Sequence, residues 1–118
     1  PITKRNKATI KATKKENPDI IQKFTNAIYK GQQWVQQHTS EEVADSIISF
    51  FPGTDKEVIV KVIDNYKNIE AYSETPEVSE DGLNKLMDII QGYDESLITE
   101  RPDFNIIVNN SFAKQAIK

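Results

Sequence analysis

Few side chains in this 118-residue chain have the types and spacing that chemistry needs. His38 is the single histidine and there is no cysteine, which excludes histidine-pair metal sites, thiolate catalysis and disulfides. Glu41, Glu42 and Asp45 form an acidic cluster, but two of them fall in the first turn of a predicted helix, where negative charge is expected without a metal. The cluster also lacks the ligand pattern of a calcium loop. We therefore expect no catalytic residue, no metal and no cofactor.

Pro1 is the one remaining candidate for catalysis, because an unacylated proline amine can act as a general base near neutral pH. Tautomerases that use such a proline place it at the start of a β-strand in a βαβ unit. Here a basic stretch follows Pro1, and helix follows helix after it. A fragment boundary explains Pro1 better, and a Pro1-dependent tautomerase is kept as an alternative.

Charge is unevenly distributed along the chain. Residues 1–16 carry a net charge of +5, against −3 for the whole sequence. A basic leader could bind nucleic acid, but no aromatic residue interrupts its lysines for base stacking. We interpret residues 7–16 as a solvated helix and expect no nucleic-acid partner. No apolar run approaches the roughly 20 residues of a transmembrane helix, and no export signal can be read.

The longest pattern predicts a helix from Pro18 to about Gln37. Asn17 is a suitable N-cap, proline suits the first turn, and Asp19 complements the positive end of the helix dipole. Apolar residues recur at helical spacing on one side, which we expect to face the core. They are Ile21, Phe24, Ile28, Gly31 and Val35, with Ile20, Ala27 and Trp34 widening the stripe; Trp34 and Tyr29 are expected at the core or its edge rather than as ligand platforms.

Two capping boxes follow, one at Thr39 to Glu42 and one at Thr54 to Glu57. Each predicts the start of a helix, and Pro52-Gly53 is expected to end the first of them. The predicted core-facing residues are Val43, Ala44, Ile47, Ile48 and Phe51 in the first helix, and Val58, Ile59, Val62, Ile63 and Tyr66 in the second.

After Asn68 the pattern is more broken. Residues 69–76 and 93–103 are predicted loops, and residues 104–108 could form a short strand. Ser79 is expected to cap a helix that ends near Gly92, and its predicted core-facing residues are Leu83, Leu86, Met87 and Ile90. Asn109-Asn110-Ser111 is expected to cap a last helix, with Phe112, Ala113, Ala116 and Ile117 facing the core. The sequence thus predicts a mainly α chain of five or six helices with at most one short strand.

Four blocks occur in the order found near the end of bacterial solute-binding proteins of ABC importers. They are KENPD (15–19), FTNAIYKGQ (24–32), FFPGTD (50–55) and NNSFAKQAI (109–117). The group that they resemble handles nitrate, sulfonates, taurine and thiamine-pyrimidine precursors. An aspartate commonly stands where this chain has Asn109, a departure that leaves the capping function intact. Residues 1–13 match least well and form a poorly matched basic leader.

The resemblance implies a single, incomplete domain over residues 1–118, the helical C-terminal part of a two-lobed α/β protein. Such a protein is exported, often as a lipoprotein, and works at the outer face of the cytoplasmic membrane or in the periplasm. It performs no catalysis: it captures a small polar solute between its lobes and delivers it to a membrane permease.

Ligand-binding residues stay unassigned at this stage. Small anions suit helix N-termini, and five are predicted, at Asn17, Thr39, Thr54, Ser79 and Asn110. Tyr72 and Ser73, in the loop before Pro76, are the weak candidates for a position facing the ligand cleft. A stand-alone helical interaction module is the second alternative. A large exposed apolar patch on the long helix would support either missing lobe contacts or a partner.

Overall fold

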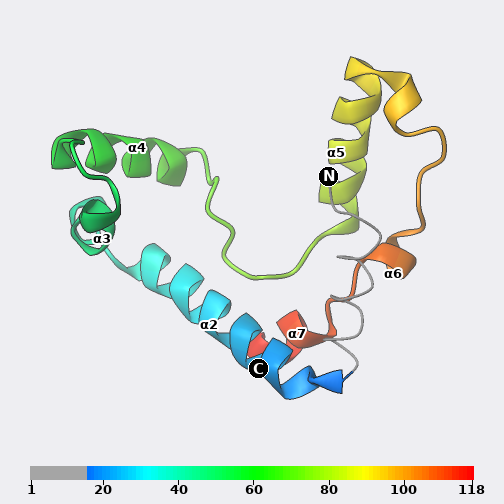
Figure 1. Ribbon diagram of the computed structural model, residues 1–118, viewed down its shortest axis with the longest axis horizontal. Coiled ribbons are helices and arrows are strands. Elements are labelled where there is room, and N and C mark those ends of the chain that lie inside the picture. Colours follow the sequence, from blue (N-terminus) through cyan, green and yellow to red (C-terminus); the bar gives the residue numbers. More distant parts are fainter. Residues whose placement is uncertain (1–15) are drawn as a thin grey trace. The chain divides into compact units, whose positions relative to one another are not determined.

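A computed structural model describes residues 16–118 of the chain (Figure 1). The described residues contain α-helices and two short 3₁₀ turns, and no strand. The α-helices are α2 (Pro18–Gln37), α3 (Ser40–Ile47), α4 (Lys56–Asn68), α5 (Glu80–Tyr93), α6 (Phe104–Ile107) and α7 (Ser111–Ile117); the 3₁₀ turns are η1 (Ile48–Phe50) and η2 (Glu95–Leu97). The prediction of a mainly α chain is confirmed. The expectations for Pro1, for the basic leader and for a helix over residues 7–16 concern residues before the described range.

The chain divides into two compact units by its internal contacts. One unit comprises Lys23–Pro76, and the other comprises the described residues up to Gln22 together with Glu77–Lys118. Helix α2 belongs to both, because the division falls between Gln22 and Lys23. That the whole sequence forms one incomplete domain stays a prediction.

Helix α2 begins and ends where the sequence predicts. The carbonyl of Asn17 accepts the first bond, from the Ile21 amide at 3.3 Å, and Asp19 lies in the first turn. The burial expected for its apolar stripe is wrong, however, because no residue of α2 is buried. Phe24 is 66% exposed and Ile28 is 44% exposed.

The core of the Lys23–Pro76 unit lies where α4 packs on α3 (Figure 1). Four residues form the buried cluster, and partly buried neighbours surround it. The buried members are Val43, Ala44, Ile59 and Ile63; Val35, Ile47, Ile48, Val60 and Tyr72 pack against them. The predicted faces of α3 and α4 are thus only partly correct, because Phe51, Val58, Val62 and Tyr66 are exposed.

The first predicted capping box is present in full. The Thr39 hydroxyl accepts from the Glu42 amide at 3.2 Å, and the Glu42 carboxylate accepts from the Thr39 amide at 2.9 Å. Helix α3 then ends at Ile47, earlier than Pro52-Gly53, because the chain tightens into the η1 turn. Gly53, at φ +83°, takes the left-handed conformation in the following turn.

The second predicted capping box is wrong. Asp55, not Thr54, occupies the N-cap of α4, and it makes no side-chain capping bond. The reason is local: the Thr54 amide donates to the Phe51 carbonyl at 3.1 Å, so Thr54 completes the preceding turn. The Asp55 carbonyl accepts the first bonds of the helix, from Val58 at 3.0 Å and Ile59 at 3.4 Å.

In the other unit, the cap of α5 is confirmed, because the Ser79 hydroxyl accepts from the Gly82 amide at 3.0 Å. The buried apolar residues described here are Met87 and Ala113, while Leu86, expected inside, is 51% exposed. Helix α5 runs to Tyr93, one residue beyond Gly92.

The short strand considered for residues 104–108 is a helical turn, α6. The Asp103 carboxylate accepts from the Asn105 amide at 2.8 Å, and the Val108 amide donates to the Phe104 carbonyl at 2.9 Å. This local capping decides against an extended conformation, since the described residues offer no strand with which to pair.

Candidate functional site

The C-terminal end of α4 sets the direction of the segment that contains Tyr72 and Ser73. The Glu70 amide donates to Lys67 at 3.0 Å, and the Ala71 amide donates back to Tyr66 at 2.8 Å. This is the pair of bonds that defines a Schellman motif, and its left-handed residue is Glu70, at φ 54°. Glycine usually occupies this position, so the reversal is made at some cost in backbone strain.

Three glutamine amides on α2 then hold the segment against the helix. Each donates to a backbone carbonyl of the segment, at 2.9 to 3.1 Å: Gln36 to Tyr72, Gln33 to Glu74, and Gln32 to Thr75. Because the bonds go to backbone, they fix the path of the segment and not its sequence. This role of the glutamines is not among the predictions made from the sequence; three glutamines at positions i, i+1 and i+4 of a helix were the available signal.

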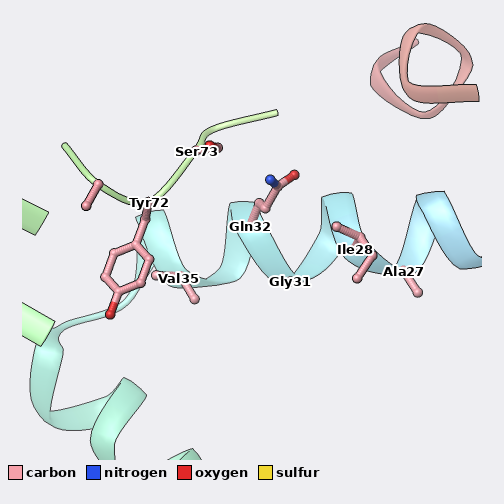
Figure 2. A pocket seen from close by; sticks show the side chains of 8 residues that line it. Ala27, Ile28, Gly31, Gln32, Val35, Tyr72 and Ser73 are labelled. Atoms are coloured by element: carbon pink, nitrogen blue, oxygen red, sulfur yellow. The ribbon is translucent and has the colours of Figure 1, made fainter. Parts of the chain in front are cut away.

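A hollow of about 470 Å³ opens between α2 and this segment (Figure 2). Figure 2 shows the Tyr72 ring beside the Val35 turn of α2, with Ser73 further along the segment. The candidate pair therefore lines a concavity of the Lys23–Pro76 unit. The full lining is Ala27, Ile28, Gly31, Gln32, Val35, Ala71, Tyr72 and Ser73.

Tyr72 also belongs to a second hollow, of about 320 Å³, on the side of α3 and α4. Its ring meets the Tyr66 ring edge to face, with 5.8 Å between centroids. Burial raises the pKa of the Tyr72 phenol above its usual value of 10, with a smaller contribution from Tyr66. The lining of the second hollow is Ile47, Phe51, Thr54, Val58, Ile59, Val62, Ile63, Tyr66 and Tyr72.

Neither hollow suits a small anion, because no charged side chain lines either of them. Recognition of a small oxyanion needs a cation or several converging N–H groups. The polar side chains of the first hollow are Gln32, Tyr72 and Ser73. The Oε1 atom of Gln32 is buried without a hydrogen-bond partner in the part of the chain that the structure describes. Both hollows are better suited to apolar groups.

Four of the five predicted helix N-termini, at Thr39, Thr54, Ser79 and Asn110, do not form an anion site either. Thr39 and Ser79 satisfy their own helices with their hydroxyls. Thr54 is not a cap, as described above. The Asn110 side chain bonds the amide and the carbonyl of Val78, at 3.0 and 2.8 Å, instead of capping α7. At the start of α5, which Val78 precedes, Glu80 and Asp81 already occupy the first turn.

His38 lies at the end of α2, as the sequence predicts. Its Nδ1 atom donates to the Trp34 carbonyl at 2.7 Å, and its ring stacks on the Trp34 ring with centroids 4.1 Å apart. Lys67 of α4 donates in turn to the His38 carbonyl. The contacts of His38 therefore stabilise the junction between α2 and α3.

No group of three or more potential metal-ligating side chains is placed to hold an ion among residues 16–118. None of the helices described in this range has the length and apolarity required to cross a membrane.

One curated protein provides a comparison. The chain is similar to "Putative binding protein YtlA" of Bacillus subtilis (strain 168), with 36% identity over 101 residues. The match takes in 86% of this chain but 30% of that protein, so the chain spans under a third of the relative's length. Since 101 of 118 residues are included, the matched region contains the helices from α2 to α5. No protein-family model matches the chain, and no solved structure matches it significantly. The similarity points to the broad class of binding proteins.

Proposed function

We propose that this chain is the helical part of a solute-binding protein of an ABC importer. The whole protein would capture a small polar solute outside the membrane, of the nitrate, sulfonate or pyrimidine-precursor class, and deliver it to a permease. It would do so without catalysis, as an exported and lipid-anchored protein at the outer face of the cytoplasmic membrane or in the periplasm.

The observation that carries the proposal is the similarity to a protein named as a binding protein. The matched region includes two of the four resembling sequence blocks in full, FTNAIYKGQ (24–32) and FFPGTD (50–55). Identity of 36% over a region of this length supports a common fold for the matched part. The solute class and the permease come from the sequence resemblance alone.

The exposed stripe of α2 also supports the proposal. The sequence predicts this stripe as a core face, yet Phe24, Ile28 and Trp34 are 66%, 44% and 36% exposed. Because these side chains are only partly exposed, each forgoes a fraction of the about 1.5 to 3 kcal/mol that complete burial contributes. A chain that packs against a further lobe would recover that free energy.

The uncharged hollows limit what these helices can do in capture. They contain no group that would neutralise an anionic solute. We therefore assign no contact with an anionic solute to these two hollows, both lined by Tyr72. The role of this chain is to support the lobe that closes on the solute.

The test is calorimetric titration of the full-length protein, purified as its native cell makes it. Nitrate, taurine, an alkanesulfonate and an aminopyrimidine are the titrants, and chloride is the control. Saturable binding of one titrant at micromolar concentration is expected. Heats indistinguishable from those of chloride for every titrant would overturn the proposed solute class.

The second candidate is a stand-alone helical interaction module, favoured by the same exposed stripe of α2. It predicts a stable 13.4 kDa product that binds a protein partner and no small solute. The Pro1-dependent tautomerase is the third candidate. Turnover of an enolisable keto acid, lost on blocking the Pro1 amine, would support it.

A further inference from the structure

A third hollow, which is polar where the first is apolar, lies beside the segment that follows α4. It measures about 240 Å³, and its lining is Gln36, Glu70, Tyr72, Ser73 and Glu74. Tyr72 and Ser73 also line the first hollow, of about 470 Å³, so the two are neighbours within the Lys23–Pro76 unit. We call these two hollows together the Glu70 site. It joins an apolar compartment on α2 to an acidic compartment at the end of α4.

The acidic compartment takes its charge from Glu70 and Glu74, and no cationic side chain lines it. Neither carboxylate forms a salt bridge within the part of the chain that the structure describes. A carboxylate accepts hydrogen bonds and donates none, so this compartment suits a cationic head group. Two carboxylates are fewer than the roughly six to eight oxygen ligands of a calcium ion, so an ammonium group fits better than a metal ion.

The apolar compartment offers space for the body of the same ligand, because most of its lining consists of apolar side chains and glycine. Figure 2 shows the Gln32 amide extending from α2 on the side of Ser73. The Oε1 atom of this amide is the buried acceptor that has no hydrogen-bond partner among residues 16–118. An N–H group of a bound molecule would satisfy it.

Two residues of the Glu70 site are unfavourable for their own backbone. Gly31 lies inside α2, where glycine is less stable than alanine, although an added Cβ would meet nothing within 4 Å among the described residues. Glu70 occupies the left-handed position that glycine usually takes. Unfavourable local choices of this kind concentrate at functional sites. Here Gly31 keeps the larger hollow open, and Glu70 gives the smaller hollow its charge.

We propose that the Glu70 site binds a small amphipathic amine. Its ammonium group lies at the Glu70 and Glu74 carboxylates, and its apolar body lies between α2 and Tyr72. This ligand is a second one, distinct from the solute of the proposed function, because the acidic compartment repels an anionic group. The inference does not rest on that function, since every residue of the site belongs to the Lys23–Pro76 unit.

Calorimetric titration of the full-length protein, purified from its own cell, tests the site with three probes of one chain length. They are n-hexylamine, 1-hexanol and hexanoate at neutral pH, where the amine is protonated. Saturable binding of hexylamine is expected, with weaker binding of hexanol and none of hexanoate. The solutes of the proposed function are titrated on the same samples, so that failure of solute binding and failure of amine binding are separate results.

One pair of variants tests the apolar compartment. Gly31→Leu fills the larger hollow and should weaken hexylamine binding by roughly tenfold or more. Gly92→Leu is the matched control, because it makes the same change inside α5, where an added Cβ also meets nothing within 4 Å among the described residues. The control should bind hexylamine as the parental protein does.

A second pair tests the charge. Glu70→Gln combined with Glu74→Gln keeps the shape of both side chains and should weaken hexylamine binding by roughly fivefold while leaving hexanol binding unchanged. Glu77→Gln combined with Glu100→Gln is the control, because both residues are exposed and lie outside the site. No saturable binding of hexylamine, equal binding of hexanoate, or equal losses in the site variants and their controls would each overturn the proposal.

Discussion

Replacing Ile63 with alanine should destabilise the α3–α4 pair more than any comparable change in its neighbourhood. The Ile63 side chain is 2% exposed and is the largest fully buried one described. The substitution removes three side-chain carbons, at about 0.8 kcal/mol each, and leaves a cavity that raises the cost further. The higher helix propensity of alanine offsets a few tenths of a kcal/mol of this loss of stability. We expect a net loss of about 2 to 4 kcal/mol.

Hydrogen exchange followed by mass spectrometry is the suitable assay, because it reports the opening of one unit by itself. A loss of about 3 kcal/mol accelerates exchange of the α3 and α4 amides by roughly a hundredfold, since 1.4 kcal/mol corresponds to a factor of ten. Ile89→Ala is the matched control. It makes the same chemical change inside helix α5, at a side chain that is 71% exposed, and should alter stability by no more than about 0.5 kcal/mol.

The refuting result is specific. If Ile63→Ala accelerates exchange of α3 and α4 no more than Ile89→Ala does, then the α3–α4 contact does not supply the core of its unit.

Three further predictions concern single contacts. Glu70→Gly should stabilise the end of α4 by about 1 kcal/mol in chemical denaturation, because glycine adopts the left-handed conformation freely; an unchanged or lower stability would contradict the strain. The hydrogen bond from the Thr39 amide lowers the pKa of Glu42 below its usual value of 4.5. The ionised Glu42 carboxylate therefore stabilises the folded state above pH 4.5, and this stabilisation is lost as the pH falls through the lowered pKa. Glu42→Gln keeps the capping acceptor and should flatten this acid dependence of the melting temperature; an unchanged acid slope would refute the assignment. Asn110→Ala removes both bonds to Val78 and should cost about 1 kcal/mol, measured as faster exchange at the start of α5; exchange at the parental rate would count against it.

The helix starts show how far sequence reasoning reaches. Thr39 and Ser79 cap as predicted because capping depends on residues within one turn. Thr54 fails for the same local reason, since the left-handed Gly53 draws its amide into the preceding turn. Residues 104–107 have a composition typical of a strand, but Asp103 precedes them. Its carboxylate accepts a hydrogen bond from the Asn105 amide, and this bond favours the helical conformation.

Burial was less predictable than helix position. Helical spacing identifies an apolar side but not which neighbour covers it, so Phe24 and Val62 read as core and are exposed. The candidate site depends on tertiary contacts for the same reason. Tyr72 and Ser73 could be proposed as cleft-facing from their loop, whereas the glutamines that hold this loop are bonded to residues 36 to 43 positions away.

Native mass spectrometry of the protein purified from its own cell tests the central proposal most directly, because one spectrum gives both the intact mass and any bound solute. We predict a mass well above the 13.4 kDa of these residues, with a non-covalent adduct of a small polar molecule that is lost on collisional activation. A product of 13.4 kDa without any such adduct would contradict the account and leave a small helical interaction module in its place.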